Sequence, residues 1–219
     1  MTELKPALLW DMDGTLFDSR ESHFKSWQLA LNNHGHYLDR EVFNANFGRN
    51  NTSSLSLFLG FQPESDYAES ILEEKEAIFR QIAPVESCLV KGVECWLSTA
   101  KARAYPQAVA SSAPMKNIES LLQSFNLIHY FDVLISGAKL PAKPEPDVFL
   151  VAARRLHQKP ESCWVIEDSP AGVKAAKNAG MRCIAVTTSN NPSDLSLADV
   201  IIEDFSLPIE KILKISRNL

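Results

Sequence analysis

The sequence lacks a long apolar run and lacks any excess of basic residues. No apolar stretch in its 219 residues approaches the length that crosses a bilayer. The first residues show no basic start, apolar stretch and small-residue cleavage site of the kind that marks a signal peptide. We therefore expect a cytoplasmic protein with no membrane partner. The formal net charge of −5 argues against nucleic-acid binding through a broad basic face.

Cysteine is also scarce, and its spacing excludes a disulfide framework. The four cysteines, at positions 88, 95, 163 and 183, form no C-x-x-C pair, so we expect reduced and mostly buried thiols. Hydrophobic residues make up 45% of the chain, which is enough for a full core in one or two domains. Charged residues make up 22%, an ordinary fraction that argues against long disordered segments.

Short apolar runs predict a parallel sheet. They lie at residues 7–12, 107–112, 131–137, 163–168, 182–188 and, more weakly, 198–204. Each run is apolar throughout rather than alternating, as expected for strands that are covered on both faces. Amphipathic stretches separate them, at residues 93–103, 116–126, 147–157 and 171–180. This alternation predicts an α/β fold with a doubly wound, Rossmann-like parallel sheet.

Residues 19–86 interrupt this alternation. Four segments there carry helical periodicity with Gly or Pro between them, and no run resembles a strand. We therefore predict an inserted all-helical cap domain over residues 19–86. The α/β core domain would comprise residues 1–18 and 87–219.

Polar clusters follow four of the predicted strands. They are Asp11 and Asp13, Ser111 and Ser112, Lys143, and Glu167 with Asp168. In an open α/β sheet the ligand site lies beyond the carboxyl ends of the strands, so these side chains are expected to meet at one edge.

The spacing of Asp11 and Asp13 places both side chains on the same side of an extended chain. Two carboxylates so close need a counter-charge, and a hard divalent cation with oxygen ligands supplies one. Asp168 offers a third carboxylate, and Mg²⁺ fits because it needs few direct protein ligands. Lys143 adds a fixed cation and Ser111 a hydroxyl. Together these groups suit a phosphoryl group, whose transfer depends on positioning and charge neutralisation.

Two proline-containing segments are expected to hold this site firmly. Ser169 is a candidate N-cap, Pro170 suits the first helical position, and Gly180 marks the helix end. Pro144 biases Lys143 toward an extended conformation. Residue Asp18, in contrast, is expected to cap the first helix of the insert.

These motifs carry a family resemblance. DMDGT (11–15), Ser111, KPEPDVF (143–149) and VIEDSPAG (165–172) match, in order, the four motifs of the haloacid dehalogenase superfamily. The match covers essentially the whole chain, and the helical insert resembles the C1-type cap of that superfamily. Within it, the sequence is most similar to the beta-phosphoglucomutase and sugar-phosphate phosphatase group, because SHFKSW (22–27) resembles its cap-entry segment.

The resemblance implies a role for each motif residue. Asp11 would be the nucleophile that forms an aspartyl phosphate, and Asp13 would be the general acid and then the general base. The resemblance also implies the residues that hold the metal and the phosphoryl oxygens. Magnesium would be held by Asp11, the backbone carbonyl of Asp13, Asp168 and, directly or through water, Glu167. The phosphoryl oxygens would be held by Ser111, the amide of Ser112 and Lys143.

Candidate substrate residues in the cap are His23, Trp27, Arg49 and Asn51. His23 and Trp27 lie one helical turn apart, so they either pack in the cap or face the substrate. The resemblance implies that an arginine at the position of Asn51 binds a second phosphate in the mutase. Here the arginine is Arg49, two residues earlier.

Phosphatase activity is therefore the favoured reading, with a phosphosugar mutase as the alternative. A mutase needs a second phosphate site, and Ala113, Pro114 and Met115 supply little for one, although Lys116 and Asn117 remain candidates. We expect a small phosphate monoester, a sugar or polyol phosphate, as the only kind of partner, with the protein a monomer or weak homodimer.

Two more distant functions stay open. A phospho-acceptor switch shares the acidic pocket and the lysine, but it has no use for a cap or for Asp13. A phosphonatase would need a cap lysine that forms a Schiff base. Lys25 and Lys75 are candidates by residue type, but their charged helical surroundings argue against that role.

Overall fold

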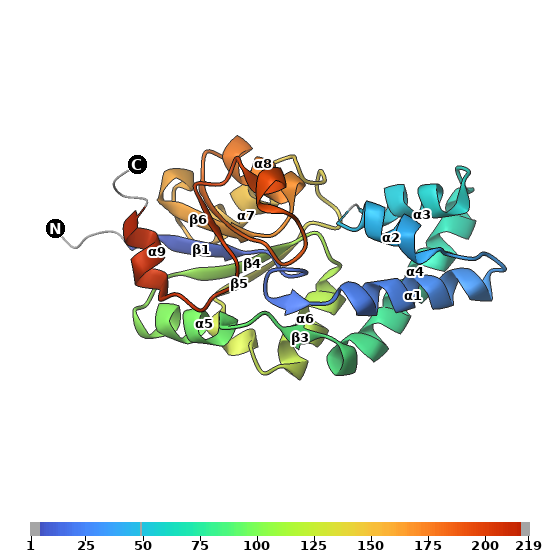
Figure 1. Ribbon diagram of the computed structural model, residues 1–219, viewed down its shortest axis with the longest axis horizontal. Helices are drawn as coiled ribbons and strands as arrows, with labels where there is room; N and C mark the ends of the chain where they lie inside the picture. The colour runs from blue at the N-terminus through green and yellow to red at the C-terminus, as the bar shows by residue number, and fades with distance from the viewer. Residues whose placement is uncertain (1–4, 49, 216–219) are drawn as a thin grey trace. The chain divides into compact units, whose positions relative to one another are not determined.

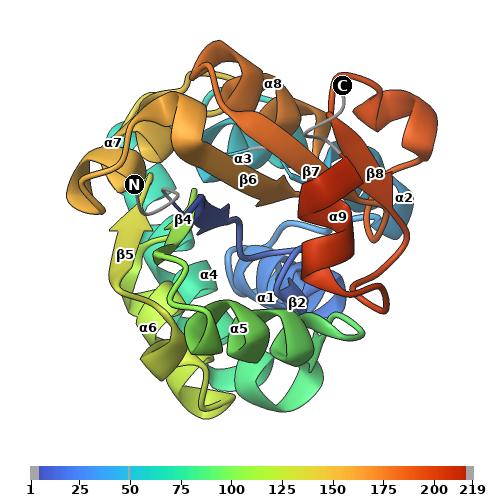
Figure 2. The same ribbon diagram turned by 90° about the vertical axis from the view of Figure 1, so that its left-hand side faces the viewer.

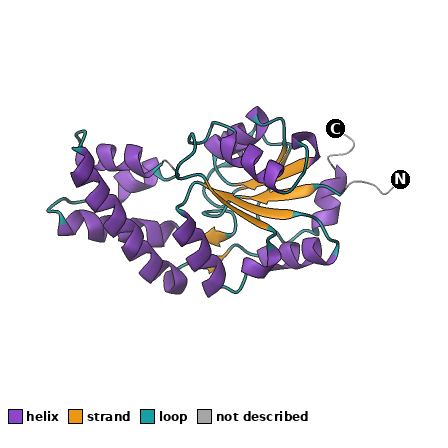
Figure 3. Ribbon diagram, turned by 180° about the vertical axis from the view of Figure 1, so that it is seen from behind, coloured by secondary structure: helices purple, strands orange, loops and turns teal. Residues whose placement is uncertain are grey.

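The computed structural model describes residues 5–48 and 50–215. Arg49, one of the candidate substrate residues, lies outside them. The chain forms two compact units, a core unit of Met1–Asp18 and Cys88–Leu219 and a helical unit of Ser19–Ser87. In Figure 3 the strands of the core unit run between layers of helices, whereas the helical unit is drawn as helices joined by loops.

A six-stranded sheet in the order β5-β4-β1-β6-β7-β8 forms the centre of the core unit (Figure 1). Its strands are β1 (Ala7–Trp10), β4 (Gln107–Ser111), β5 (Val133–Ser136), β6 (Cys163–Glu167), β7 (Arg182–Val186) and β8 (Val200–Ile202). Every neighbouring pair is parallel, which confirms the predicted fold class and all six predicted strands. Because β1 pairs with both β4 and β6, its carboxyl end lies between theirs.

Helices cover both faces of this sheet (Figure 2). One face is covered by α7 (Asp147–Arg155) and α8 (Pro170–Asn178), and the other by α5 (Val93–Ala102), α6 (Met115–Ser124) and α9 (Ile209–Ile215). Short 3₁₀ helices lie at Ile128–Tyr130, Pro160–Ser162 and Pro192–Leu195. Consecutive residues of β1 point to opposite faces of the sheet. Leu9 joins the cluster under α7 and α8, whereas Trp10 packs against Trp96 of α5 at 6.3 Å between ring centroids.

A second, two-stranded sheet was not predicted. β2 (Phe17–Asp18) pairs antiparallel with β3 (Cys88–Leu89), so the chain leaves and re-enters the core unit side by side. The expectation that Asp18 caps the next helix is wrong, because the N-cap residue is Ser19 and Asp18 pairs with Cys88.

The helical unit contains α1 (Arg20–Asn33), α2 (Arg40–Asn46), α3 (Asn51–Leu59) and α4 (Ser65–Glu86). Local signals start two of these helices, since the Asp39 side chain accepts hydrogen bonds from two N–H groups in the first turn of α2 and the Asn50 side chain accepts one in the first turn of α3. The unit has its own apolar core. It includes Phe24, Trp27, Ala30, Leu31, Leu38, Phe43, Leu55 and Ile71.

Two further expectations concern membranes and thiols. Within residues 5–48 and 50–215, no helix has the length and apolarity that a membrane crossing requires. The four cysteines are free; Cys163 and Cys183 are buried as predicted, whereas Cys88 and Cys95 are exposed.

Candidate active site

The first part of the site is a tight turn after β1. The Asp11 N–H donates to the carbonyl of Ile166 at 2.9 Å, which fixes Asp11 beside the end of β6. The chain then folds back, with the Gly14 N–H donating to the carbonyl of Phe17 at 2.7 Å. Gly14 has a φ of +82°, a left-handed conformation that glycine adopts without strain. The Asp13-Gly14 turn therefore follows directly after the carboxyl end of β1, where Asp11 bonds β6.

The second part is the connection from β6 to α8. One oxygen of Glu167, Oε2, accepts hydrogen bonds from the Asp168 N–H, the Ser169 N–H and the Ser169 hydroxyl, at 2.7, 2.7 and 2.9 Å. Ser169 Oγ in turn accepts from the Gly172 N–H, which confirms Ser169 as the N-cap and Pro170 as the first helical residue. The carboxylate of Glu167 is thus locked against the start of α8.

Lys143 joins these two parts. Its Nζ lies 2.5 Å from Asp11 Oδ1 and 2.7 Å from Glu167 Oε1, and the side chain of Lys143 is only 8% exposed. The ammonium also lies 4.8 Å from the ring centroid of Phe149. Burial alone would lower the pKa of Lys143, but the charges of Asp11 and Glu167 outweigh it and raise the pKa above its ordinary value. Lys143 is therefore a permanent cation in the site.

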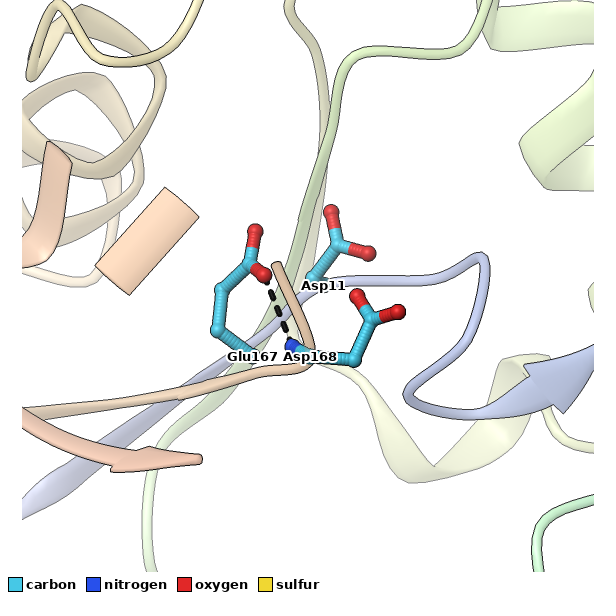
Figure 4. Close-up of side chains that lie close together, drawn as sticks. All are labelled: Asp11, Glu167 and Asp168. Carbon is cyan, nitrogen blue, oxygen red and sulfur yellow. Dashed lines mark hydrogen bonds between the residues drawn. The ribbon is translucent and has the colours of Figure 1, made fainter. Parts of the chain in front are cut away.

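Three carboxyl groups meet next to this cation. Asp11, Glu167 and Asp168 each offer an oxygen within 4.8 Å of the others, and all three residues are buried (Figure 4). Burial, with the charges of Glu167 and Asp13, raises the pKa of Asp11 to about 7 despite the opposing effect of Lys143. Burial and the charges of Glu167 and Asp11 likewise raise the pKa of Asp168 well above its usual range.

The charge balance of this cluster fits a divalent cation. Three carboxylates face the single ammonium of Lys143, so the buried site carries excess negative charge when all are ionised. Hard oxygen donors in this number and spacing suit Mg²⁺, which keeps water and substrate oxygens in the rest of its octahedron. The donor set therefore fits the metal that the sequence motifs predict.

Three further residues predicted for the site lie in the core unit: Ser111, Ser112 and Asp13. Ser111 ends β4, beside β1, and its Oγ accepts a hydrogen bond from the Ala113 N–H at 3.1 Å. Ser112 follows it and is exposed. The charge of Asp13 contributes to the raised pKa of Asp11.

The candidates in the helical unit fall into two groups. Trp27 is 4% exposed and packs edge-on against Phe58 at 5.3 Å, so it belongs to the apolar core of that unit. His23 and Asn51 instead join a polar cluster. Asn51 Nδ2 donates to Glu76 Oε1 at 2.5 Å, and His23 Nδ1 lies 3.3 Å from the Nζ of Lys75.

Lys75 is buried although its sequence neighbours are charged. It lies between two glutamates in α4, yet it is 1% exposed and its Nζ bonds Glu76 Oε1 at 2.7 Å. The aromatic rings of Trp27 and Phe79 lie 5.4 and 5.2 Å from the same ammonium. An ion pair and two aromatic rings therefore surround the amine of Lys75.

The sequence reading missed a polar loop after β7. Thr188 donates its hydroxyl hydrogen bond to the Gly14 carbonyl, and Asn190 Nδ2 donates to the Asp168 carbonyl at 2.9 Å. Ser189 makes a hydrogen bond with the side chain of Asp168. The sequence did contain a signal for this loop: its polar residues follow a parallel strand, as the four recognised polar clusters do.

The sequence is similar to a known family of hydrolases and to individual enzymes. The sequence model of a family described as haloacid dehalogenase-like hydrolase matches residues 8–186. The chain is 30% identical over 190 residues to fructose-1-phosphate phosphatase of Escherichia coli, covering 85% of this chain and 98% of that one. It is 29% identical over 190 residues to beta-phosphoglucomutase of Bacillus subtilis, covering 82% of each.

Among solved structures, CbbY from Rhodobacter sphaeroides in complex with phosphate superimposes with a TM-score of 0.85. The two chains are 28% identical, and the match covers 93% of this chain and 96% of that one. The similarity therefore extends over both units of the chain and over the motifs that meet at the site.

Proposed function

Since the chain belongs to the haloacid dehalogenase-like hydrolases, we propose that it is a magnesium-dependent phosphatase that hydrolyses a small sugar or polyol phosphate through an aspartyl phosphate on Asp11. The observation that carries this proposal is the contact between Lys143 and Asp11 inside a buried cluster of three carboxylates. Relatives named as phosphatases of phosphorylated sugars support the substrate class.

In the first step, an oxygen of Asp11 attacks the phosphorus of the monoester and the bond to the leaving oxygen breaks. Lys143 favours the ionised form of Asp11 and attracts the phosphoryl oxygens, while Asp13 gives its proton to the departing alcohol. A divalent cation held by Asp11, Asp168 and the carbonyl of Asp13 would neutralise the phosphoryl charge. The products of this step are the free alcohol and phosphorylated Asp11.

In the second step, a water molecule attacks the phosphorus of phosphorylated Asp11 and gives a proton to Asp13. Inorganic phosphate leaves, and the carboxylate of Asp11 and the acid form of Asp13 are restored. Ser111 and the N–H of Ser112 lie at the end of the neighbouring strand and are the proposed donors to the phosphoryl oxygens in both steps.

The role proposed for Glu167 differs from that of Asp168. Its Oε2 already accepts three hydrogen bonds and its Oε1 bonds Lys143. We therefore propose that Glu167 orients Lys143 and reaches the metal through water, whereas Asp168 is a direct ligand.

The substrate contacts outside the core are proposed from the resemblance. His23 and Asn51 carry polar groups in the cluster around Glu76, and they remain candidate specificity residues together with Arg49. The buried position of Trp27 favours a packing role for that residue.

The test is a phosphate-release screen with purified protein. Fructose 1-phosphate, other sugar phosphates, polyol phosphates, phosphoglycolate and nucleotides are compared with and without Mg²⁺. Asp11→Asn is expected to abolish turnover, whereas Asp18→Asn, an exposed aspartate in β2, is the matched control that retains it. Wild-type turnover in Asp11→Asn would refute the nucleophile assignment.

A mutase is the second candidate, because beta-phosphoglucomutase of Bacillus subtilis is a relative of similar identity. Asn117, one of two polar residues available for a second phosphate, is 1% exposed within α6, which favours hydrolysis. Isomerisation of glucose 1-phosphate that depends on a sugar bisphosphate and exceeds phosphate release would reverse this order. Phosphorylation of Asp11 without turnover would instead indicate a phospho-acceptor switch.

A further inference from the structure

The loop at residues 187–191, called here the β7 loop, is anchored at its base to the sheet. It begins where β7 ends at Val186, and the Thr187 N–H donates to the carbonyl of Ile202 on β8 at 3.0 Å. A 3₁₀ helix starting at Pro192 closes its far end. Because both ends belong to regular structure, the loop presents its side chains from a fixed position.

Two hydrogen bonds from the β7 loop reach separate parts of the active site. The Thr188 hydroxyl bonds the carbonyl of Gly14, in the turn that carries the nucleophile, and Asn190 Nδ2 bonds the carbonyl of Asp168. These two carbonyls belong to segments more than 150 residues apart in sequence. The loop therefore ties the turn after β1 to the turn after β6.

Ser189 acts on a side chain instead of the backbone. It makes a hydrogen bond with the carboxyl group of Asp168. A Cβ built on Gly14 would collide with that carboxyl group and lie 2.7 Å from Ser189 Oγ. The carboxyl group of Asp168 and the hydroxyl of Ser189 therefore both lie next to Gly14, and Asp168 is 4% exposed.

This arrangement has a direct chemical effect. A hydroxyl that donates to one oxygen of a carboxylate fixes the plane of the group and leaves the other oxygen for a cation. The absence of a side chain at Gly14 leaves room for the Asp168 carboxyl group beside the turn, and the hydroxyl of Ser189 bonds that group there. We propose that Ser189 positions Asp168 as a metal ligand, and that Thr188 holds the Asp13-Gly14 turn against it. This assignment rests on the metal site proposed above.

The test measures metal binding without substrate. Mn²⁺ binding is followed by calorimetry for the wild type, Ser189→Ala and Ser189→Thr. The loss of a group that orients a metal ligand weakens metal affinity by about 10–100-fold, so we expect Ser189→Ala to bind Mn²⁺ at least tenfold more weakly. Ser189→Thr keeps the hydroxyl and should recover most of the affinity. Ser193→Ala, an exposed serine just beyond the loop, is the matched control and should bind as the wild type does.

A second pair of variants keeps the test decisive if Ser189→Ala is unstable. Thr188→Val removes the bond to the Gly14 carbonyl while keeping the side-chain shape, and should weaken Mn²⁺ binding; Thr188→Ser should restore it. Thr188 is exposed, so folding is not at risk from lost core packing.

Other outcomes separate this assignment from the proposed function. Mn²⁺ binding that is lost in Asp168→Asn but unchanged in folded Ser189→Ala would overturn the role of Ser189 alone. A wild-type protein that binds no Mn²⁺, or that binds it equally well after Asp168→Asn, would refute the metal site and this assignment together.

Discussion

The core unit is expected to lose stability as pH rises when no divalent cation is present. In the folded chain the pKa of Asp11 is about 7, against an ordinary value of 3.8, because the group is buried beside other carboxylates. Between these two pH values the folded state holds a proton that the unfolded state releases. The free energy of unfolding therefore falls as pH rises from about 4 to about 7.

The size of this effect follows from the shift in pKa. A difference of roughly 3 units at 1.36 kcal/mol each gives about 4 kcal/mol of lost stability by pH 8. About 3 kcal/mol of this loss falls between pH 5 and pH 8. For a chain of this length each kcal/mol corresponds to roughly 2–4 °C in Tm, so we expect Tm to fall by roughly 6–12 °C over that range. Asp168 adds to it with the same sign, because its pKa is also raised.

The assay is thermal unfolding between pH 5 and pH 8, with either a chelator or saturating Mg²⁺. Unfolding is followed by tryptophan fluorescence, to which Trp10, buried in the sheet of the core unit, contributes. We expect Mg²⁺ to raise Tm strongly at pH 8 and little at pH 5, because protons compete for the same carboxylates. Asp11→Asn removes the titrating group and should flatten the pH dependence. A chelated wild type whose Tm is constant or rises from pH 5 to pH 8 would refute the reasoning.

Three further predictions concern individual residues. Lys143→Met should lower kcat for phosphate release by roughly 10²–10³-fold, because it removes a preorganised cation from the phosphoryl site; an activity within tenfold of wild type would contradict this. Gly172→Ala usually favours a helix, but here the new Cβ would collide with the carboxylate of Glu167. We expect urea denaturation to show a loss of about 1–3 kcal/mol instead of a gain. Thr15→Val should leave the free energy of unfolding unchanged or raise it by about 1 kcal/mol, because Thr15 Oγ1 is buried without a partner among the described residues. A clear loss of stability in the same denaturation assay would show that this hydroxyl is satisfied.

Much of the core fold could be predicted because its signals are local. Continuous apolar runs are typical of strands buried on both faces, and each of the six predicted runs contains one strand of the observed sheet. The start of α8 was predictable for the same reason, since Ser169 and Pro170 act on their own helix. The pairing of β2 with β3 was not, because each has two residues and their partner lies about 70 positions away.

The missed parts of the site have physical explanations. The predicted strand at 182–188 included Thr187 and Thr188, because threonine favours strands, whereas β7 ends at Val186. This error concealed the polar loop that follows. The burial of Lys75 depends on Glu76 and on rings from two helices of the helical unit, and the sequence around a single lysine does not contain that information.

The pairing of β2 with β3 has a consequence for how the chain folds. Seen from the core unit, residues 19–87 are one long loop whose ends must meet before Asp18 can pair with Cys88. Closing a flexible loop of about 70 residues costs roughly 4 kcal/mol of chain entropy beyond a constant term. The helical unit itself brings those ends together, since Ser22 Oγ at the start of α1 lies 3.0 Å from Ser87 Oγ just after α4. Early folding of the insert would therefore remove most of this entropic cost, and hydrogen exchange should show the β2 and β3 amides opening whenever α1 and α4 separate.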